Sequence, residues 1–188
     1  LAFFFFIDGV YTIISMATTY GQSLGLDSTG LLLALLVTQI VAFPFSILFG
    51  RLSAKYDTGL LIKVCILCYT GITIFGMFLF HLWQFWVLAV LVGMFQGGVQ
   101  AMSRSYLGKI IPPENSGEYF GLMDICGKGA DALGPALIAM VSSLMGARTV
   151  TVFGMRLQGQ NLGVGFLTVL FVIGYVLFCK ADKLNKQR

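Results

Sequence analysis

The stretch GLMDICGKGADALGP, Gly121 to Pro135, places two acids and a base inside an apolar segment. Asp124, Lys128 and Asp131 follow one another at offsets of four and three residues, which puts them on one face of an α-helix. The surrounding chain of 188 residues is 57% hydrophobic and 11% charged. Because a soluble domain carries about 25% charged residues, the stretch predicts a membrane helix with an acid–base–acid column.

Apolar runs of about 20 residues recur along the chain, and a helix of that length spans the hydrocarbon core of a bilayer. Polar or helix-breaking segments separate these runs, such as Asp57-Thr58-Gly59 and Pro112-Pro113. The sequence therefore predicts an all-α membrane protein, with one six-helix transmembrane bundle over residues 1–188. The predicted helices cover roughly residues 2–22, 29–50, 60–80, 84–108, 117–145 and 161–179.

The distribution of lysine and arginine predicts the orientation of these helices. One side of the membrane receives nine of these residues, whereas the other side receives only Arg148 and Arg156. Because cytoplasmic loops are enriched in Lys and Arg, the first side is predicted to be cytoplasmic, together with the start of the chain and its C-terminus. We expect an integral protein of the plasma membrane. The nine residues are Arg51, Lys55, Lys63, Arg104, Lys109, Lys180, Lys183, Lys186 and Arg188.

Two further predicted helices carry polar stripes at helical spacing. A charged side chain at the bilayer centre costs about 2.5–3.5 kcal/mol, so such faces need a protein interior or a water-filled cavity. We predict a polar cavity whose opposite wall lies outside this chain. The alternative is an ion-pair column that only holds packed helices together. The stripes are Asp8, Thr12, Ser15, Thr19 and Gln22 in the first helix, and Gln96, Gln100, Ser103 and Arg104 in the fourth.

Other motifs do not fit their context. The segment Gly127–Ala132 matches the dinucleotide pattern G-x-G-x-x-A, but no strand precedes it. The pair Cys65 and Cys68 lies within an apolar run and has no accompanying histidine cluster. The basic residues lie between spans, which argues against a nucleic-acid partner. The sequence thus predicts no enzyme, cofactor or metal site; the expected partners are membrane lipids and a small-molecule substrate.

The segment GRLSAKYD, residues 50–57, resembles the signature loop of the major facilitator superfamily, with Ala54 and Asp57 departing from its pattern. The chain is also similar to the vacuolar-effluxer-like branch of that superfamily, which includes amino-acid effluxers. The segments that carry this second resemblance are IDGVYTI (7–13), VTQIVAFP (37–44), GGVQAMSRS (97–105) and SGEYFGLMDICGKGADALGP (116–135).

The resemblance implies the C-terminal half of a twelve-helix transporter, built from two inverted three-helix repeats around a midplane site. The missing N-terminal half, or a homodimer partner, would then supply the opposite wall. Because the chain opens inside an apolar run, we expect either a fragment or a natural half-size protein. The resemblance also implies a cytoplasmic gating loop that contains Gly50, Arg51, Lys55 and Asp57.

These features predict a secondary active transporter for a small polar solute, with amino acids as the implied candidates and proton coupling expected. Asp124 or Asp131 would take up a proton while Lys128 pairs with the ionised form, and Asp8 is the alternative protonation site. Arg104 would bind a substrate carboxylate or anchor the helix through Glu118. The alternatives are a lipid or drug exporter and a non-transporting scaffold. The predicted substrate cavity comprises Thr12, Ser15, Thr19, Gln96, Gln100 and Arg104.

Overall fold

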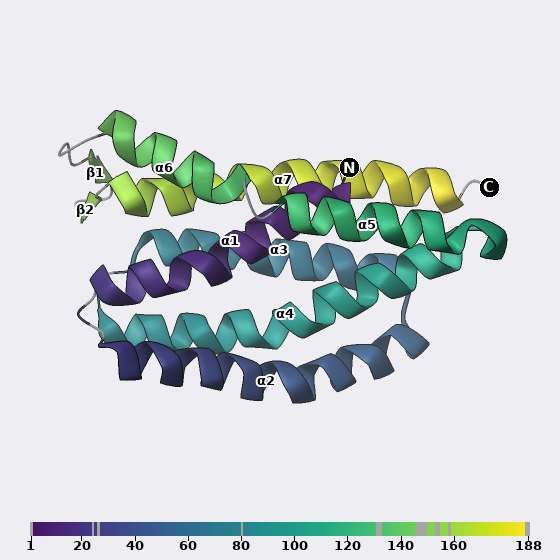
Figure 1. The fold of residues 1–188 in the computed structure, drawn as a ribbon, viewed down its shortest axis with the longest axis horizontal. Helices are drawn as coiled ribbons and strands as arrows, with labels where there is room; N and C mark the ends of the chain where they lie inside the picture. Colours follow the sequence, from purple (N-terminus) through teal and green to yellow (C-terminus); the bar gives the residue numbers. More distant parts are fainter. Residues whose placement is uncertain are drawn as a thin grey trace.

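The computed structural model describes residues 2–23, 25, 27–79, 81–130, 133–145, 150–152, 155–157 and 159–186. Within these residues the fold is a bundle of long helices with one short β-hairpin (Figure 1). The long helices are α1 (Ala2–Ser23), α2 (Ser28–Lys55), α3 (Thr58–Met77), α4 (Leu82–Ile110), α5 (Ser116–Ala130), α6 (Leu133–Met145) and α7 (Gly159–Lys186). The remaining elements are the 3-10 turn η1 (Pro113–Asn115) and the strands β1 (Val150–Val152) and β2 (Met155–Leu157).

The expected membrane spans are present. Five of the described helices, α1, α2, α3, α4 and α7, are long and apolar enough to cross a bilayer. Aspartate side chains cap two of them: Asp27 accepts the Gly30 N–H at the start of α2, and Asp57 accepts the Gly59 N–H at the start of α3. Helices α5 and α6 lie within the residues of the remaining predicted span.

The helix predicted over residues 117–145 is described in two parts: α5 ends at Ala130 and α6 begins at Leu133 (Figure 1). Pro135 lies near the start of α6 as described, where its ring and its missing N–H disfavour a regular ladder of helical hydrogen bonds. The predicted member Asp131 lies outside the described residues.

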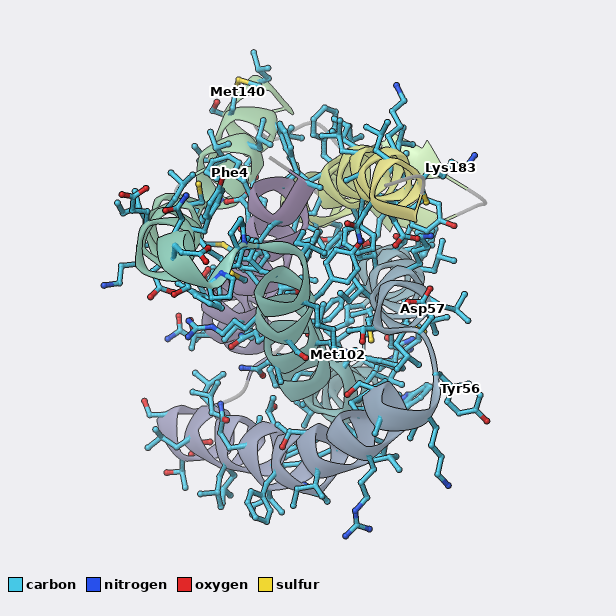
Figure 2. The ribbon with its side chains drawn as sticks, turned by 90° about the vertical axis from the view of Figure 1, so that its right-hand side faces the viewer. Phe4, Tyr56, Asp57, Met102, Met140 and Lys183 are labelled. Atoms are coloured by element: carbon cyan, nitrogen blue, oxygen red, sulfur yellow. The ribbon has the colours of Figure 1, made fainter. Side chains whose placement is uncertain are left out.

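Two other boundaries differ from the sequence prediction. The predicted gating loop over residues 50–57 is helical up to Lys55, because GRLSAK contains no helix breaker after Gly50, and only Tyr56 and Asp57 connect α2 to α3 (Figure 2). The last helix does not stop at residue 179 but runs to Lys186. The loop before it contains the antiparallel pair β1–β2, whose β-branched Val150, Thr151 and Val152 favour a strand.

Small residues set the helix packing. At Gly93 in α4, an added Cβ would lie 2.6 Å from the carbonyl oxygen of Thr38 in α2, so these two backbones are in close contact. Gly9 in α1 leaves room for the ring of Phe171 in α7, and Gly174 in α7 leaves room for Phe6 in α1. Helix α2 packs chiefly along α4, and α7 lies against α1, α3 and α6.

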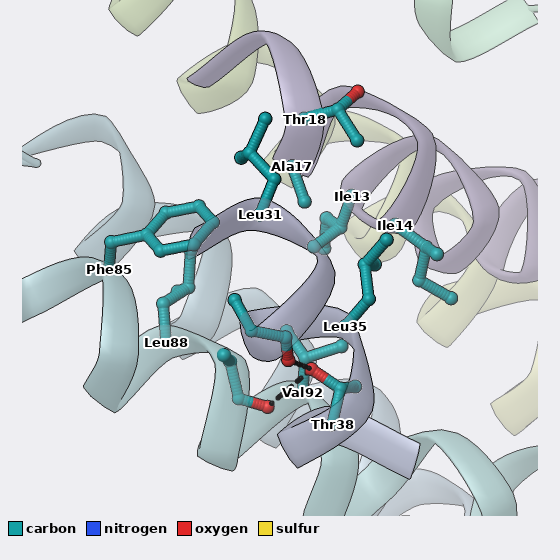
Figure 3. A pocket seen from close by; sticks show the side chains of 12 residues that line it. Ile13, Ile14, Ala17, Thr18, Leu31, Leu35, Thr38, Phe85, Leu88 and Val92 are labelled. Carbon is teal, nitrogen blue, oxygen red and sulfur yellow. Dashed lines mark hydrogen bonds between the residues drawn. The ribbon is translucent and has the colours of Figure 1, made fainter. Parts of the chain in front are cut away.

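Apolar side chains fill the interior, where Met102 lies among the helices (Figure 2). The rings of Tyr69 and Phe171 stack with centroids 5.5 Å apart. A small apolar cavity of about 40 Å³ remains between α1, α2 and α4 (Figure 3). Thr38 lines this cavity, and its hydroxyl donates to the carbonyls of Ala34 and Ala89. The Thr38 O–H is therefore not available to a solute.

Candidate functional site

A cavity of about 320 Å³ lies between α1, α4 and α5. This volume is in the range of small-molecule sites, which occupy roughly 300–1,000 Å³. Helix α1 contributes aromatic side chains, while α4 and α5 contribute the charged and amide groups. We call this space the polar cavity; its lining residues are Phe3, Tyr11, Gln100, Arg104, Met123, Asp124, Gly127 and Lys128.

An ion pair crosses the polar cavity from α4 to α5. The Arg104 guanidinium donates to Asp124 Oδ1 over 2.9 Å, and their side chains are 62% and 54% exposed. At 1.5 Å of rise per residue, Arg104 lies about 9 Å inside the end of α4 and Asp124 about 12 Å inside the start of α5. A pair this exposed contributes about 0–1 kcal/mol to stability, so the fold does not depend on it.

This pairing differs from the predicted one. Asp124 contacts Arg104, whereas the sequence suggested Lys128 for Asp124 and Glu118 for Arg104. Lys128 lines the same cavity with an exposed side chain and forms no ion pair within the described part of the chain. Arg104, Asp124 and Lys128 together give the cavity a formal charge of +1, because two cations face one carboxylate.

The polar stripe of α1 divides into two parts. Asp8 and Thr12 are fully buried, and Asp8 Oδ1 accepts the backbone N–H of Gly134 in α6 over 3.1 Å. Ser15 and Thr19 are exposed instead. None of these four residues lines the polar cavity.

The remaining predicted residues lie elsewhere. Gln100 lines the polar cavity, but Gln96 does not, and the buried Gln96 Oε1 has no hydrogen-bond partner in the described structure. Arg51 and Lys55 are exposed on the last turns of α2. Gly50 has open space around it, since no atom lies within 4 Å of a Cβ added there.

A second polar cluster joins the ends of α3, α4 and α7. Lys63 pairs with Asp182 at 2.5 Å, and the Tyr106 hydroxyl donates to the same carboxylate over 2.9 Å. Nearby, Lys109 donates to the Thr58 hydroxyl over 2.8 Å. The sequence prediction missed this cluster because it assigned residue 182 to a cytoplasmic tail. The available signal was helical spacing, since Asp182 follows the buried Phe178 by four residues.

An apolar cavity of about 190 Å³ adjoins the polar cavity, and the two share Phe3 and Met123. Aromatic rings from α1, α4, α5 and α7 dominate its lining, with Ser103 and Cys126 as its small polar members. The Ser103 hydroxyl already donates to the Val99 carbonyl. This second space therefore suits an apolar group beside a charged one.

Comparison with known proteins assigns the chain to a family. A family model described as "Vacuole effluxer Atg22 like" matches residues 1–186. The chain belongs to this family. Its relatives in the vacuole effluxer family include an "Uncharacterized MFS-type transporter YxiO" from Bacillus subtilis, 43% identical over 177 residues, or 94% of this chain. An "Autophagy-related protein 22-2" from Aspergillus clavatus is 26% identical over 163 residues, or 77% of this chain.

The chain spans only part of these vacuole effluxer relatives, namely 39% of the Bacillus protein and 26% of the Aspergillus protein. Together with the five candidate spans among the described residues, this family membership confirms an all-α membrane fold that corresponds to half of a major facilitator protein. The descriptions of the family and of the Bacillus relative name an effluxer and a transporter rather than an enzyme.

Proposed function

We propose that the full-length protein is a secondary active transporter that exports a small polar solute, with zwitterionic amino acids as the preferred class. The observation that carries this proposal is the exposed Arg104–Asp124 pair inside the polar cavity. An exposed ion pair within membrane-spanning helices is not stable against lipid, so it requires water, solute or protein on its open side.

The charges of the polar cavity support a solute with a carboxylate. Arg104 offers a planar fork of donors that matches a carboxylate, and Lys128 adds a second positive charge. Asp124 suits the ammonium group of the same solute. A zwitterion can therefore enter by exchanging partners with the existing ion pair, which replaces one set of charge-assisted hydrogen bonds with another.

Alternating access requires a second wall. The relatives are more than twice the length of this chain, and transporters of the superfamily place their site between two six-helix halves. In the proposed protein, the remaining part of the polypeptide or a second copy faces α1, α4 and α5. Rocking of the two walls then exposes the polar cavity to each side of the membrane in turn.

Counterflow in proteoliposomes tests the transport proposal. Full-length protein loaded with unlabelled amino acids should take up labelled amino acid, and Asp124→Asn should lower that uptake at least tenfold, since one lost charge-assisted contact is worth about 1.5–3 kcal/mol. Glu118→Gln is the matched control, because Glu118 is exposed on the same helix but does not line the polar cavity. Equal uptake by Asp124→Asn and wild type would mean that the ion pair does not belong to the binding site.

The apolar cavity beside Phe3 and Met123 favours a second candidate, an exporter of amphipathic drugs or lipids. Such a solute would place its apolar part among the aromatic rings and its charged part at Arg104. Competition separates the two candidates in the same assay. Inhibition by amphipathic cations or lysolipids, with no response to amino acids, would favour the second candidate; absence of exchange with any solute from folded protein would favour a scaffold.

A further inference from the structure

We propose that Lys128 selects the solute of the polar cavity and that the preferred solute is an acidic amino acid, which carries one ammonium and two carboxylate groups. This inference rests on the proposed transport function and names its substrate class. Its basis is the charge of the lining: within the described part of the chain, the polar cavity holds one more cation than it holds carboxylates.

The first observation is that one cation of the polar cavity has no counter-charge among the described residues. Arg104 and Asp124 balance each other across 2.9 Å. Lys128 lines the same cavity with an exposed side chain, yet neither ion pair of the described structure includes it. At 1.5 Å of rise per residue, Lys128 lies about 18 Å inside the start of α5. A cation at such a depth in a membrane segment needs an anionic partner or a water-filled space.

The second observation is that the polar groups of the cavity lie at two levels. The chain reverses at η1 between α4 and α5, so both helices lead inward from the same end of the bundle (Figure 1). On α4, Gln100 precedes Arg104 by four residues, which is about 6 Å farther from that end. On α5, Lys128 follows Asp124 by the same interval. The ion pair therefore forms the outer level of the cavity, and Gln100 and Lys128 form the inner level.

An acidic amino acid offers one charged group for each charged side chain of this lining. Its ammonium group suits Asp124, and one carboxylate suits the planar donor fork of Arg104. The second carboxylate would extend to the inner level, where the Lys128 ammonium and the Gln100 amide can both donate to it. A solute with one net negative charge thus balances the one net positive charge of the described lining.

The adjoining apolar cavity offers a competing explanation, in which the solute has an apolar side chain. That space shares Phe3 and Met123 with the polar cavity, so leucine could place its side chain there. Such a solute has no net charge and would leave Lys128 without a counter-ion in the occupied site. Because an unbalanced charge becomes costly when a solute displaces the water around it, the charge of Lys128 favours the acidic solute.

Stabilisation by bound solute tests the inference without transport. The unfolding temperature of purified full-length protein in detergent is measured at rising concentrations of L-glutamate, its uncharged isostere L-glutamine, and L-leucine. Wild type should bind glutamate about tenfold more tightly than glutamine, because glutamine replaces a charged acceptor with a neutral one. Lys128→Gln should bind the two solutes equally, whereas Lys128→Arg should keep the preference. Lys183→Gln is the matched control, because it removes an exposed cation outside the polar cavity and should keep the preference too.

Three results would overturn the inference. Equal affinities of wild type for glutamate and glutamine would exclude an acidic preference, and a preference for leucine would assign the solute's side chain to the apolar cavity. A preference for glutamate that survives in Lys128→Gln would mean that another group selects the charge. If Lys128→Gln yields no folded protein, Lys128→Met takes its place, because it keeps an unbranched side chain without the charge.

The counterflow assay separates this inference from the proposed function. Exchange of amino acids together with equal affinities for glutamate and glutamine would overturn the acidic preference alone. The absence of exchange, together with no effect of any amino acid on the unfolding temperature, would overturn the proposed function as well.

Discussion

At the scale of single residues, Asp182 holds three helix ends together. Its carboxylate is 2% exposed, pairs with Lys63 of α3 and accepts the hydroxyl of Tyr106 from α4. Gly59 makes room for it, since a Cβ there would lie 2.5 Å from Asp182 Oδ1. One side chain of α7 therefore fixes the position of α3 and α4 at this end of the bundle.

Removing the charge of Asp182 should destabilise the protein. Asp182→Asn leaves Lys63, whose side chain is only 20% exposed, without its counter-charge, and breaking such a buried pair costs about 3 kcal/mol. We expect a clear drop in the unfolding temperature of the purified protein. Lys183→Gln is the control, because that neighbouring side chain is exposed at the end of the bundle (Figure 2). Equal unfolding temperatures for the two variants would contradict this role.

Residue types predicted part of the candidate site. Helical spacing from sequence identified Gln100, Arg104 and Asp124 as facing groups, and these do line one cavity. The partner of Asp124 was not predictable, because spacing along α5 favours Lys128 whereas Arg104 approaches from another helix. The burial of Asp8 and Thr12 was likewise hidden, since it depends on how closely Gly134 lets α6 approach.

At the scale of helices, α2 and α4 pack closely through glycine. Gly93 lies against the backbone of Thr38, and Gly97 lies against Ala42 and Ser46. The four-residue spacing of these glycines puts both on one face of α4, which was recognisable in the sequence. The similar pair Gly117 and Gly121 in α5 has no atom within 4 Å of an added Cβ, so the same spacing there makes no close contact.

Adding one methyl group at this contact should separate the helices. In Gly93→Ala the new Cβ would lie 2.6 Å from a backbone oxygen that cannot rotate away, so we expect a loss of about 1–3 kcal/mol in unfolding free energy. Gly71→Ala is the matched control, because nothing lies within 4 Å of that position on α3. Its methyl group should leave stability unchanged or raise it by up to about 1 kcal/mol. Denaturation of both purified variants measures the difference; a Gly93→Ala protein as stable as Gly71→Ala would refute the close contact.

Helix existence was predictable, whereas helix ends were less so. Runs of about 20 apolar residues are sufficient to identify spans, because a helix of that length satisfies its backbone hydrogen bonds internally in lipid. The extension of α2 to Lys55 was hidden by a sequence pattern that suggested a loop.

At the scale of the whole molecule, the two ends of the bundle differ in charge. One end gathers the connections α2–α3 and α4–α5 and the C-terminus, while the hairpin β1–β2 and the connection α1–α2 lie at the other (Figure 1). Lys55, Lys109 and Lys183 all belong to the first end. The orientation in which the first end faces the cytoplasm stays a prediction from the Lys and Arg distribution.

Cysteine labelling tests this orientation in intact cells. In a background without native cysteines, Lys183→Cys should react with a membrane-impermeant maleimide only after the membrane is opened. The reason is that the positive-inside rule predicts a cytoplasmic C-terminal end for α7. Thr151→Cys in β1 should react without opening, since the hairpin lies at the opposite end of the bundle. Denatured samples of both variants control for the amount of protein. The reverse pattern would contradict the predicted orientation, because the end of the bundle that carries Lys183 would then face outward.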